Sequence, residues 1–156
     1  MSKTAWGIDK FDLFKGLNAM EIQEVAKISN KVHFNKNEII ASETDVTRDI
    51  FILIAGSVEI ISFNGVPLYR IASGEIFGEL AFVPSLKRTA IALTREDSWV
   101  LVMNINHLEK LGEEYPDIYK KISNNLVTSI GIKLARANKL IELLKTELSK
   151  SLKSRS

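Results

Sequence analysis

Residues 74–92 have the sequence GEIFGELAFVPSLKRTAIA, which is the most informative segment of the 156-residue chain. Gly78 stands where a short apolar strand should end, and residues 79–82 can form one helical turn before Pro84. Unpaired backbone N–H groups at the start of such a turn favour an anion. The segment therefore predicts a strand, a tight turn and a binding site for a negatively charged group.

Three polar side chains of this segment fit the same kind of ligand. Nine residues after Glu79 comes Arg88, whose planar guanidinium suits bidentate contact with a phosphate. Thr89 adds a hydroxyl, and the Glu79 carboxylate can accept hydrogen bonds from sugar hydroxyls. Each residue taken singly is more typical of a solvated surface charge or a turn. Their combination predicts a site for a ligand that carries a sugar and a phosphate.

Short apolar runs on both sides of this segment predict antiparallel β-structure. Residues 58–63 and 66–71 flank Asn64-Gly65, a dipeptide that strongly favours a tight hairpin turn. Further apolar runs, separated by polar residues, lie at 51–54, 90–93 and 99–103. Roughly seven or eight short strands at this spacing indicate a sandwich, a barrel or a roll.

Helices are predicted at both ends of the chain. Asn18 can cap a helix, and Glu21 three residues later completes a capping box. From Pro116 to about Ser149 no further proline interrupts the chain, which predicts one helix about 50 Å long at 1.5 Å per residue. Its apolar residues form one stripe with steps of three or four: Leu126, Ile130, Leu134, Ala137, Ile141, Leu144 and Leu148. A domain this small cannot cover such a helix, so we expect its far end to pack on a partner, most simply a second copy.

Composition and charge limit the function classes. The chain is 46% hydrophobic and 26% charged, as is ordinary for a globular domain, and its net charge of +2 is too small to indicate a polyanionic partner. The absence of cysteine excludes a disulfide scaffold, a thiolate zinc site and a cysteine nucleophile. No apolar run approaches about 18 residues and the N-terminus has no signal-peptide core, so we expect a cytoplasmic protein without a membrane anchor.

The histidines and serines give no indication of catalysis. His33 and His107 are isolated, with no His-x-His or His-x-x-x-His partner, so no metal site is predicted. No Ser, His and Asp residues have the sequence context of a catalytic triad. We therefore expect no enzymatic activity, no catalytic residue, no metal and no cofactor.

Residues 77–90 resemble a motif of a known protein family. Phe-Gly-Glu-Leu-Ala at 77–81, with Arg-Thr-Ala at 88–90, is similar to the phosphate-binding cassette of cyclic nucleotide-binding domains. Such domains occur in regulatory subunits of cyclic-nucleotide-dependent kinases, in gated channels and in the bacterial catabolite activator family. Further landmarks follow in the family's order: Leu13-Phe14-x-x-Leu17, Ile54-x-Gly56-x-Val58, Ser73-Gly74-Glu75 and Tyr115-Pro116-Asp117. The resemblance covers residues 8–148 and implies an α+β fold: an antiparallel β-roll of double-stranded jelly-roll type, flanked by N-terminal helices and a long C-terminal helix.

The resemblance also implies roles for the cassette residues. Glu79 should accept a hydrogen bond from the ribose 2′-hydroxyl, with help from the backbone of Gly78 and Leu80. Arg88 should pair with the cyclic phosphate. These four residues would hold the sugar–phosphate part of the ligand.

Three further cassette residues complete the implied site. The N–H groups of Ala81 and Ala90 should bond the phosphate oxygens. Thr89 lies where relatives place a small or hydroxylated residue next to the phosphate and the base. The implied ligand is a cyclic nucleotide, with cAMP favoured over cGMP, although Thr89 could serve either base.

The long helix departs from the family pattern in one place. Thr128-Ser129 invite comparison with helix residues that touch adenine in the catabolite activator. Counted from the landmark at 115–117, however, this pair falls five residues too early, and Lys133 and Leu134 occupy the corresponding positions. The adenine contact is therefore not assigned to Thr128-Ser129.

We expect one cyclic nucleotide-binding domain with consecutive parts. Residues 1–30 should form an N-terminal helical segment, and residues 31–104 the β-roll with the cassette at 77–90. Residues 105–149 should form the C-terminal helices, and residues 150–156 a basic tail.

The predicted function is a cyclic nucleotide sensor whose ligand repositions the C-terminal helix. Because the sensor uses residues 8–148, its output should act in trans, on a second copy in a homodimer through the C-terminal helix or on another protein. Two alternatives stay open: a ligand-free dimeric scaffold that docks another protein, and the sensor fragment of a DNA-binding transcription regulator. The basic residues between Lys133 and Ser156 favour a solvated helix face over a nucleic-acid contact.

Overall fold

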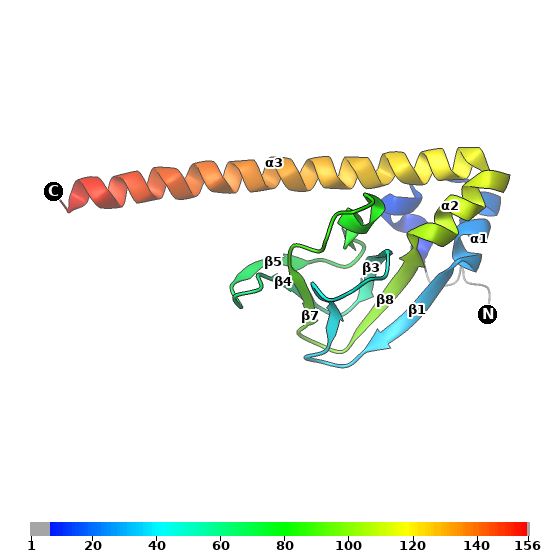
Figure 1. Cartoon of the computed structure of the whole chain (residues 1–156), viewed down its shortest axis with the longest axis horizontal. Helices are drawn as coiled ribbons and strands as arrows, with labels where there is room; N and C mark the ends of the chain where they lie inside the picture. The colour runs from blue at the N-terminus through cyan, green and yellow to red at the C-terminus, as the bar shows by residue number, and fades with distance from the viewer. Residues whose placement is uncertain (1–6, 156) are drawn as a thin grey trace.

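The computed structural model describes residues 7–155, and these form a β-roll crossed by one long helix (Figure 1). Two four-stranded antiparallel sheets have the orders β1-β8-β3-β6 and β2-β7-β4-β5. The strands are β1 (Ser29–Phe34), β2 (Ile39–Ala41), β3 (Asp49–Ala55), β4 (Val58–Ile61), β5 (Pro67–Ile71), β6 (Ile76–Phe77), β7 (Ile91–Thr94) and β8 (Ser98–Asn104). This architecture confirms the predicted α+β fold with an antiparallel β-roll.

Helical segments precede, interrupt and follow the strands. The α-helices are α1 (Ala19–Lys27), α2 (Ile105–Glu114) and α3 (Pro116–Ser154), and the 3₁₀ turns are η2 (Ile8–Lys10), η3 (Asp12–Phe14) and η4 (Glu79–Phe82). In α1 the Asn18 side chain accepts from the Glu21 N–H at 2.9 Å, and Glu21 Oε1 accepts from the Asn18 N–H at 2.9 Å. This reciprocal pair is the predicted capping box.

The hairpin between β4 and β5 forms where the Asn64-Gly65 pair predicts it. Gly65 has a φ of +82°, a left-handed conformation that glycine adopts without strain. The Ser62 N–H donates to the Val66 carbonyl at 2.8 Å and closes the turn. A local sequence signal therefore fixes this part of the topology.

The core has two parts because β3 and β8 are covered on both faces. Side chains alternate across a strand, so Phe51 and Leu53 point into the roll while Ile50 and Ile52 point toward the helices. On the helical side these residues pack with Ile118, Ile122 and Leu126 of α3, and also with apolar residues of η3 and α1. The first part of α3 is thus fixed by the same core that carries the sheet.

Two element boundaries differ from the sequence prediction. The first strand begins at Ser29, two residues before the expected start of the roll at 31. Helix α3 extends to Ser154 instead of ending near Ser149, because residues 150–154 contain neither glycine nor proline and continue the helical repeat. Most of the predicted basic tail is therefore helix, and residue 156 lies outside the described residues.

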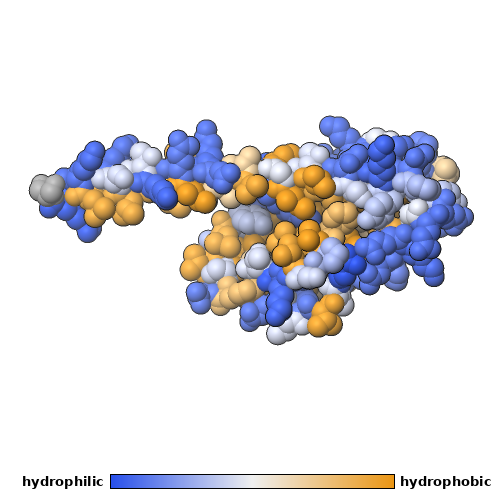
Figure 2. Space-filling view, turned by 45° about the horizontal axis from the view of Figure 1, so that its top comes forward, coloured by the Kyte–Doolittle hydropathy of each residue, from blue (hydrophilic) through white to orange (hydrophobic). Residues whose placement is uncertain are grey.

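The far part of α3 extends away from the roll (Figure 1). At 39 residues the helix is about 58 Å long. We call residues 116–127 the docked segment and residues 138–154 the projecting segment. Large apolar side chains of the projecting segment are half or more exposed, and Figure 2 shows apolar surface along it: Leu140, Ile141, Leu143, Leu144, Leu148 and Leu152. Within residues 7–155, no helix combines the length and apolar character needed to cross a membrane.

Candidate functional site

A cavity of about 450 Å³ lies between the roll and the middle of α3. Most of the predicted cassette residues line it: Gly78, Glu79, Leu80, Arg88, Thr89 and Ala90. The roll adds apolar and aromatic side chains, among them Ile60, Tyr69 and Phe77, and α3 adds Ile130, Lys133, Leu134 and Ala137. The fold thus gathers residues from the cassette, the neighbouring strands and the long helix around one space.

Gly78 shapes the cassette at the end of β6. Its φ is +72°, and a Cβ at this position would lie 2.8 Å from Cδ2 of Phe51 and 2.9 Å from an Nη atom of Arg88. Phe51 is held in turn by stacking on Phe77, with ring centroids 5.1 Å apart. Glycine is required here both by the left-handed backbone and by the close approach of Arg88.

Glu79 is a buried carboxylate with one oxygen paired and one unpaired. The residue is 6% exposed, and its Oε1 lies 2.7 Å from Nζ of Lys133. Its Oε2 is enclosed and has no hydrogen-bond partner. Because burying a polar atom without a partner is costly, this oxygen is available to a donor that enters the cavity.

Arg88 brings a positive charge to the same cavity. Its side chain is 9% exposed, lies over the Phe51 ring at 5.3 Å and donates from Nη2 to the Asp49 carbonyl at 3.1 Å. Its Nε is 3.5 Å from Oδ2 of Asp45 and makes no hydrogen bond. Burial lowers the pKa of Arg88, and the charges of Asp45 and Asp49 oppose that shift. An arginine stays protonated at neutral pH in any such setting, so Arg88 offers an anion a partly unsatisfied guanidinium.

Ala81 differs from the other predicted cassette residues. It does not line the cavity: its side chain belongs to the core on the helical side, and its N–H donates to the Gly78 carbonyl at 3.1 Å within η4. The 3₁₀ turn already uses this donor, and the implied contact of the Ala81 N–H with phosphate stays a prediction. The N–H of Ala90 stays a predicted contact, since that residue does line the cavity.

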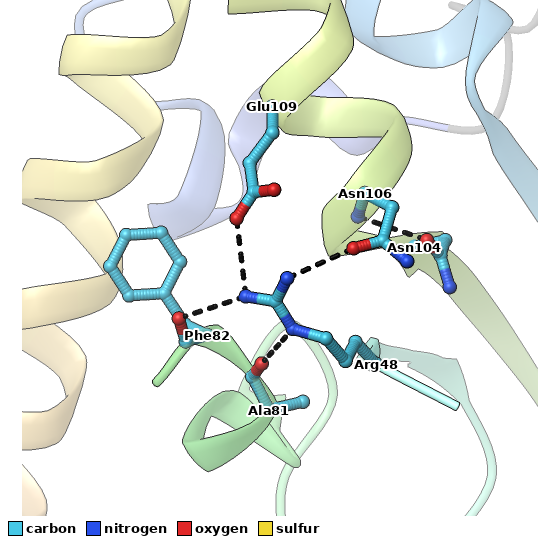
Figure 3. A network of polar contacts seen from close by, with 6 residues as sticks. All are labelled: Arg48, Ala81, Phe82, Asn104, Asn106 and Glu109. Carbon is cyan, nitrogen blue, oxygen red and sulfur yellow. Dashed lines mark hydrogen bonds and ion pairs between the residues drawn. The ribbon is translucent and has the colours of Figure 1, made fainter. Parts of the chain in front are cut away.

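Arg48 ties the cassette turn to α2 and is absent from the sequence prediction (Figure 3). From one side, its guanidinium donates to the carbonyls of Ala81 at 3.2 Å and Phe82 at 3.3 Å. From the other side it contacts Oδ1 of Asn106 at 2.9 Å and Oε1 of Glu109 at 3.2 Å. A single side chain thus links η4 to the helix that leads into α3.

On its α3 side, the cavity is lined at the helical positions that are predicted by counting from the landmark at residues 115–117. Lys133 and Leu134 line the cavity, whereas Thr128 and Ser129 border a separate hollow of about 320 Å³. Ile130 and Ala137 are members of the apolar stripe, so their periodicity was visible in the sequence but their role in the cavity was not.

Tyr69 is a further lining residue that no motif indicates. Burial raises the pKa of its phenol, and the charges of Glu79 and Glu75 raise it further. The phenol is therefore neutral at pH 7 and leaves Glu79, Arg88 and Lys133 as the charged side chains that line the cavity. Among residues 7–155, no three His, Asp or Glu side chains gather where they could hold a metal ion.

Comparisons with known proteins agree with this geometry. The family model described as "Cyclic nucleotide-binding domain" matches residues 31–115. The Pycsar effector protein BcPycTIR of Burkholderia cepacia is 30% identical over 113 residues, which cover 72% of this chain and 36% of that protein. The chain spans 36% or less of the length of the first curated relatives it matches.

Two solved structures share the fold. A cyclic nucleotide-binding domain from Methylobacillus flagellatus aligns with a TM-score of 0.79 at 15% identity, covering 90% of this chain and 84% of that one. The catabolite activator protein of Thermus thermophilus aligns with a TM-score of 0.71 at 22% identity, covering 86% and 63%.

Proposed function

Since this chain belongs to the cyclic nucleotide-binding domain family, we propose that its cavity binds a cyclic nucleotide and that the chain acts as a sensor without catalysis. One observation carries the proposal: the cavity is lined by a buried carboxylate and a buried guanidinium, and the Oε2 of the first and the Nε of the second have no hydrogen-bond partner. The ribose of a cyclic nucleotide brings a hydroxyl donor for Glu79, and its phosphate brings acceptors for Arg88.

The charge of the cavity supports a monoanionic ligand. Glu79 carries one negative charge, and Lys133, which pairs with it, carries one positive charge. Arg88 adds one positive charge, and the carboxylates that act on it, Asp45 at 3.5 Å and Asp49, do not line the cavity. The lining side chains therefore carry one net positive charge, which matches the single negative charge of a cyclic phosphodiester.

Within this class we propose that cAMP binds more tightly than cGMP. Except for Lys133, the α3 residues that line the cavity are apolar: Ile130, Leu134 and Ala137. Adenine has one exocyclic polar group where guanine has two, so an apolar wall costs adenine less desolvation. Thr89 contributes a hydroxyl to the cavity wall that could serve either base.

We propose that ligand binding signals through α3, which both lines the cavity and projects beyond the roll. A ligand shifts the helix only if it binds two arrangements of α3 with different affinity. The stripe Leu134, Ala137, Ile141, Leu144 and Leu148 has the alternating three- and four-residue steps of a two-stranded coiled coil. The proposed output is therefore a change in how the projecting segment packs on a second copy.

The ligand proposal is tested by calorimetric titration with cAMP, cGMP, cCMP and cUMP. Arg88→Gln and Glu79→Gln should each weaken binding by about tenfold or more, since a charge-assisted hydrogen bond contributes about 1.5–3 kcal/mol. Arg70→Gln is the matched control, because Arg70 is exposed on β5 and pairs with Glu59 outside the cavity. No binding by the wild-type chain, or undiminished affinity in both cavity variants, would refute the proposal.

A ligand-free dimeric scaffold is the second candidate, favoured by the exposed apolar side chains of the projecting segment. Sedimentation of the wild type and of Leu144→Asp distinguishes the two. A dimer that the substitution dissociates, in a chain that binds none of the four nucleotides, would establish the scaffold. Dimerisation together with nucleotide binding would support the sensor.

A further inference from the structure

A lysine of α3 closes the cavity at the proposed ribose-binding carboxylate. Lys133 lies 54 residues after Glu79, yet its Nζ is 2.7 Å from Oε1 of Glu79 and donates to the Ile76 carbonyl at 2.5 Å. Its side chain is 21% exposed and lines the same cavity. The ammonium therefore joins α3 to both β6 and η4.

The two oxygens of the Glu79 carboxylate have different surroundings. Oε1 is taken by Lys133, and Oε2 is enclosed without a partner. A buried carboxylate with no cation beside it would be costly, and removing one member of a buried pair is strongly unfavourable. Lys133 thus holds Glu79 through one oxygen while the other stays free to accept.

We propose that Lys133 is a specificity-determining residue: it positions Glu79 so that Oε2 accepts from a ribose 2′-hydroxyl, and it makes α3 part of that recognition. This inference rests on the proposed function, because it assigns the cavity a cyclic ribonucleotide. It predicts that discrimination between a cyclic ribonucleotide and its 2′-deoxy analogue depends on a residue of the helix and not only on the cassette.

A different role for the same contact makes the opposite prediction. If Lys133 merely occupied the ribose position and were displaced by ligand, removing it would strengthen binding. The unpaired Oε2 argues for positioning, since the carboxylate can accept a hydroxyl without losing its contact with Lys133.

The experiment measures affinity for the tightest-binding cyclic ribonucleotide and for its 2′-deoxy analogue in the wild type, Lys133→Met and Lys133→Arg. Lys133→Met should weaken ribonucleotide binding by about tenfold or more and leave binding of the deoxy analogue within about twofold, because the lost interaction runs through the 2′-hydroxyl. Lys133→Arg should restore part of the difference in affinity between the cyclic ribonucleotide and its 2′-deoxy analogue. The matched control is Lys139→Met, on an exposed position of α3 that does not line the cavity.

A double-variant cycle separates positioning from a general structural effect. Combining Lys133→Met with Glu79→Gln should weaken ribonucleotide binding little more than Glu79→Gln alone, because both substitutions remove one shared interaction. Equal losses for the two ligands, tighter ribonucleotide binding or unchanged discrimination in Lys133→Met would overturn the inference while leaving the proposed function intact. Failure of the wild type to bind any cyclic nucleotide would instead remove the proposed function, and this inference with it.

Discussion

The docked and projecting segments of α3 have the same kind of sequence and opposite surroundings. In the docked segment Ile118, Ile122 and Leu126 are 2% exposed or less and belong to the main core. In the projecting segment Leu144 and Leu148 continue the stripe but are 61% and 60% exposed. An amphipathic pattern therefore predicts that a helix face will be covered, without saying which surface covers it.

The part of α3 between these two segments lies at the cavity. Ile130, Lys133 and Leu134 lie over the cavity, so the cavity lies between the docked and the projecting segments. In the proposed function, a ligand in the cavity reorients the projecting segment while the docked segment stays in the core.

The largest effect is expected from truncation in the docked segment. Ile122→Ala should lower the free energy of unfolding by about 2–5 kcal/mol, because Ile122 is fully buried and the substitution leaves a cavity. Leu144→Ala, in the projecting segment, should change it by no more than about 0.5 kcal/mol. Urea unfolding at low protein concentration, where copies do not associate, measures both. Similar losses in the two variants would contradict the division of α3.

A close contact between α2 and the docked segment should be the next most sensitive feature. A Cβ at Gly112 would lie 2.8 Å from Cβ and 2.9 Å from Cγ of Tyr119. Overpacking of this kind costs about 1–3 kcal/mol, and the better helix propensity of alanine offsets about 1 kcal/mol. Gly112→Ala should therefore destabilise the protein by up to about 2 kcal/mol, as measured by urea unfolding.

A glycine-to-alanine substitution in the middle of α3 should instead raise the free energy of unfolding. A Cβ at Gly131 would meet no atom within 4 Å, and the residue is exposed. Gly131→Ala should stabilise the protein by up to about 1 kcal/mol through helix propensity alone. A loss of stability in this variant would show that α3 needs flexibility at Gly131.

The smallest effect concerns the ion pair that ties the docked segment to α1. The hydrogen bond from the Asn18 backbone, followed by the contact with Lys121, lowers the pKa of Glu21 from its ordinary value of 4.5. A group with a lowered folded-state pKa contributes stability that is complete above its unfolded value and is lost as the pH falls through the folded value.

Unfolding free energies measured from about pH 7 to about pH 3 test this contribution. Glu21→Gln should reduce stability at neutral pH, and the wild-type and variant curves should converge below about pH 4.5. Glu142→Gln, on the exposed projecting segment, should leave the difference between neutral and acid stability unchanged. A constant gap between wild type and Glu21→Gln at all pH values would assign the loss to the cap geometry instead of the charge.

Local features of the fold could be predicted because their causes are local. The Asn18–Glu21 capping box, the Gly65 turn and the 3₁₀ turn after Gly78 each involve residues within a few positions of one another. The end of α3 was predicted about five residues too early, because a polar, basic sequence permits helix as well as tail. A resemblance places Ala81 in a motif but does not show that its N–H also bonds within the turn, and its contact with phosphate stays a prediction.

The chemistry of this protein can be inferred from its sequence: a carboxylate, a guanidinium and a glycine turn at spacings typical of cyclic nucleotide-binding domains, in a chain of short strands and terminal helices. The folded structure was needed to show that Lys133 reaches Glu79, that Arg48 joins η4 to α2 and that the large apolar side chains of the projecting segment are exposed. Backbone patterns and turns depend on neighbouring residues and can be inferred from the sequence. Contacts between residues 33 or more positions apart, such as Arg48 with Ala81, depend on how whole elements pack, and no periodicity encodes that.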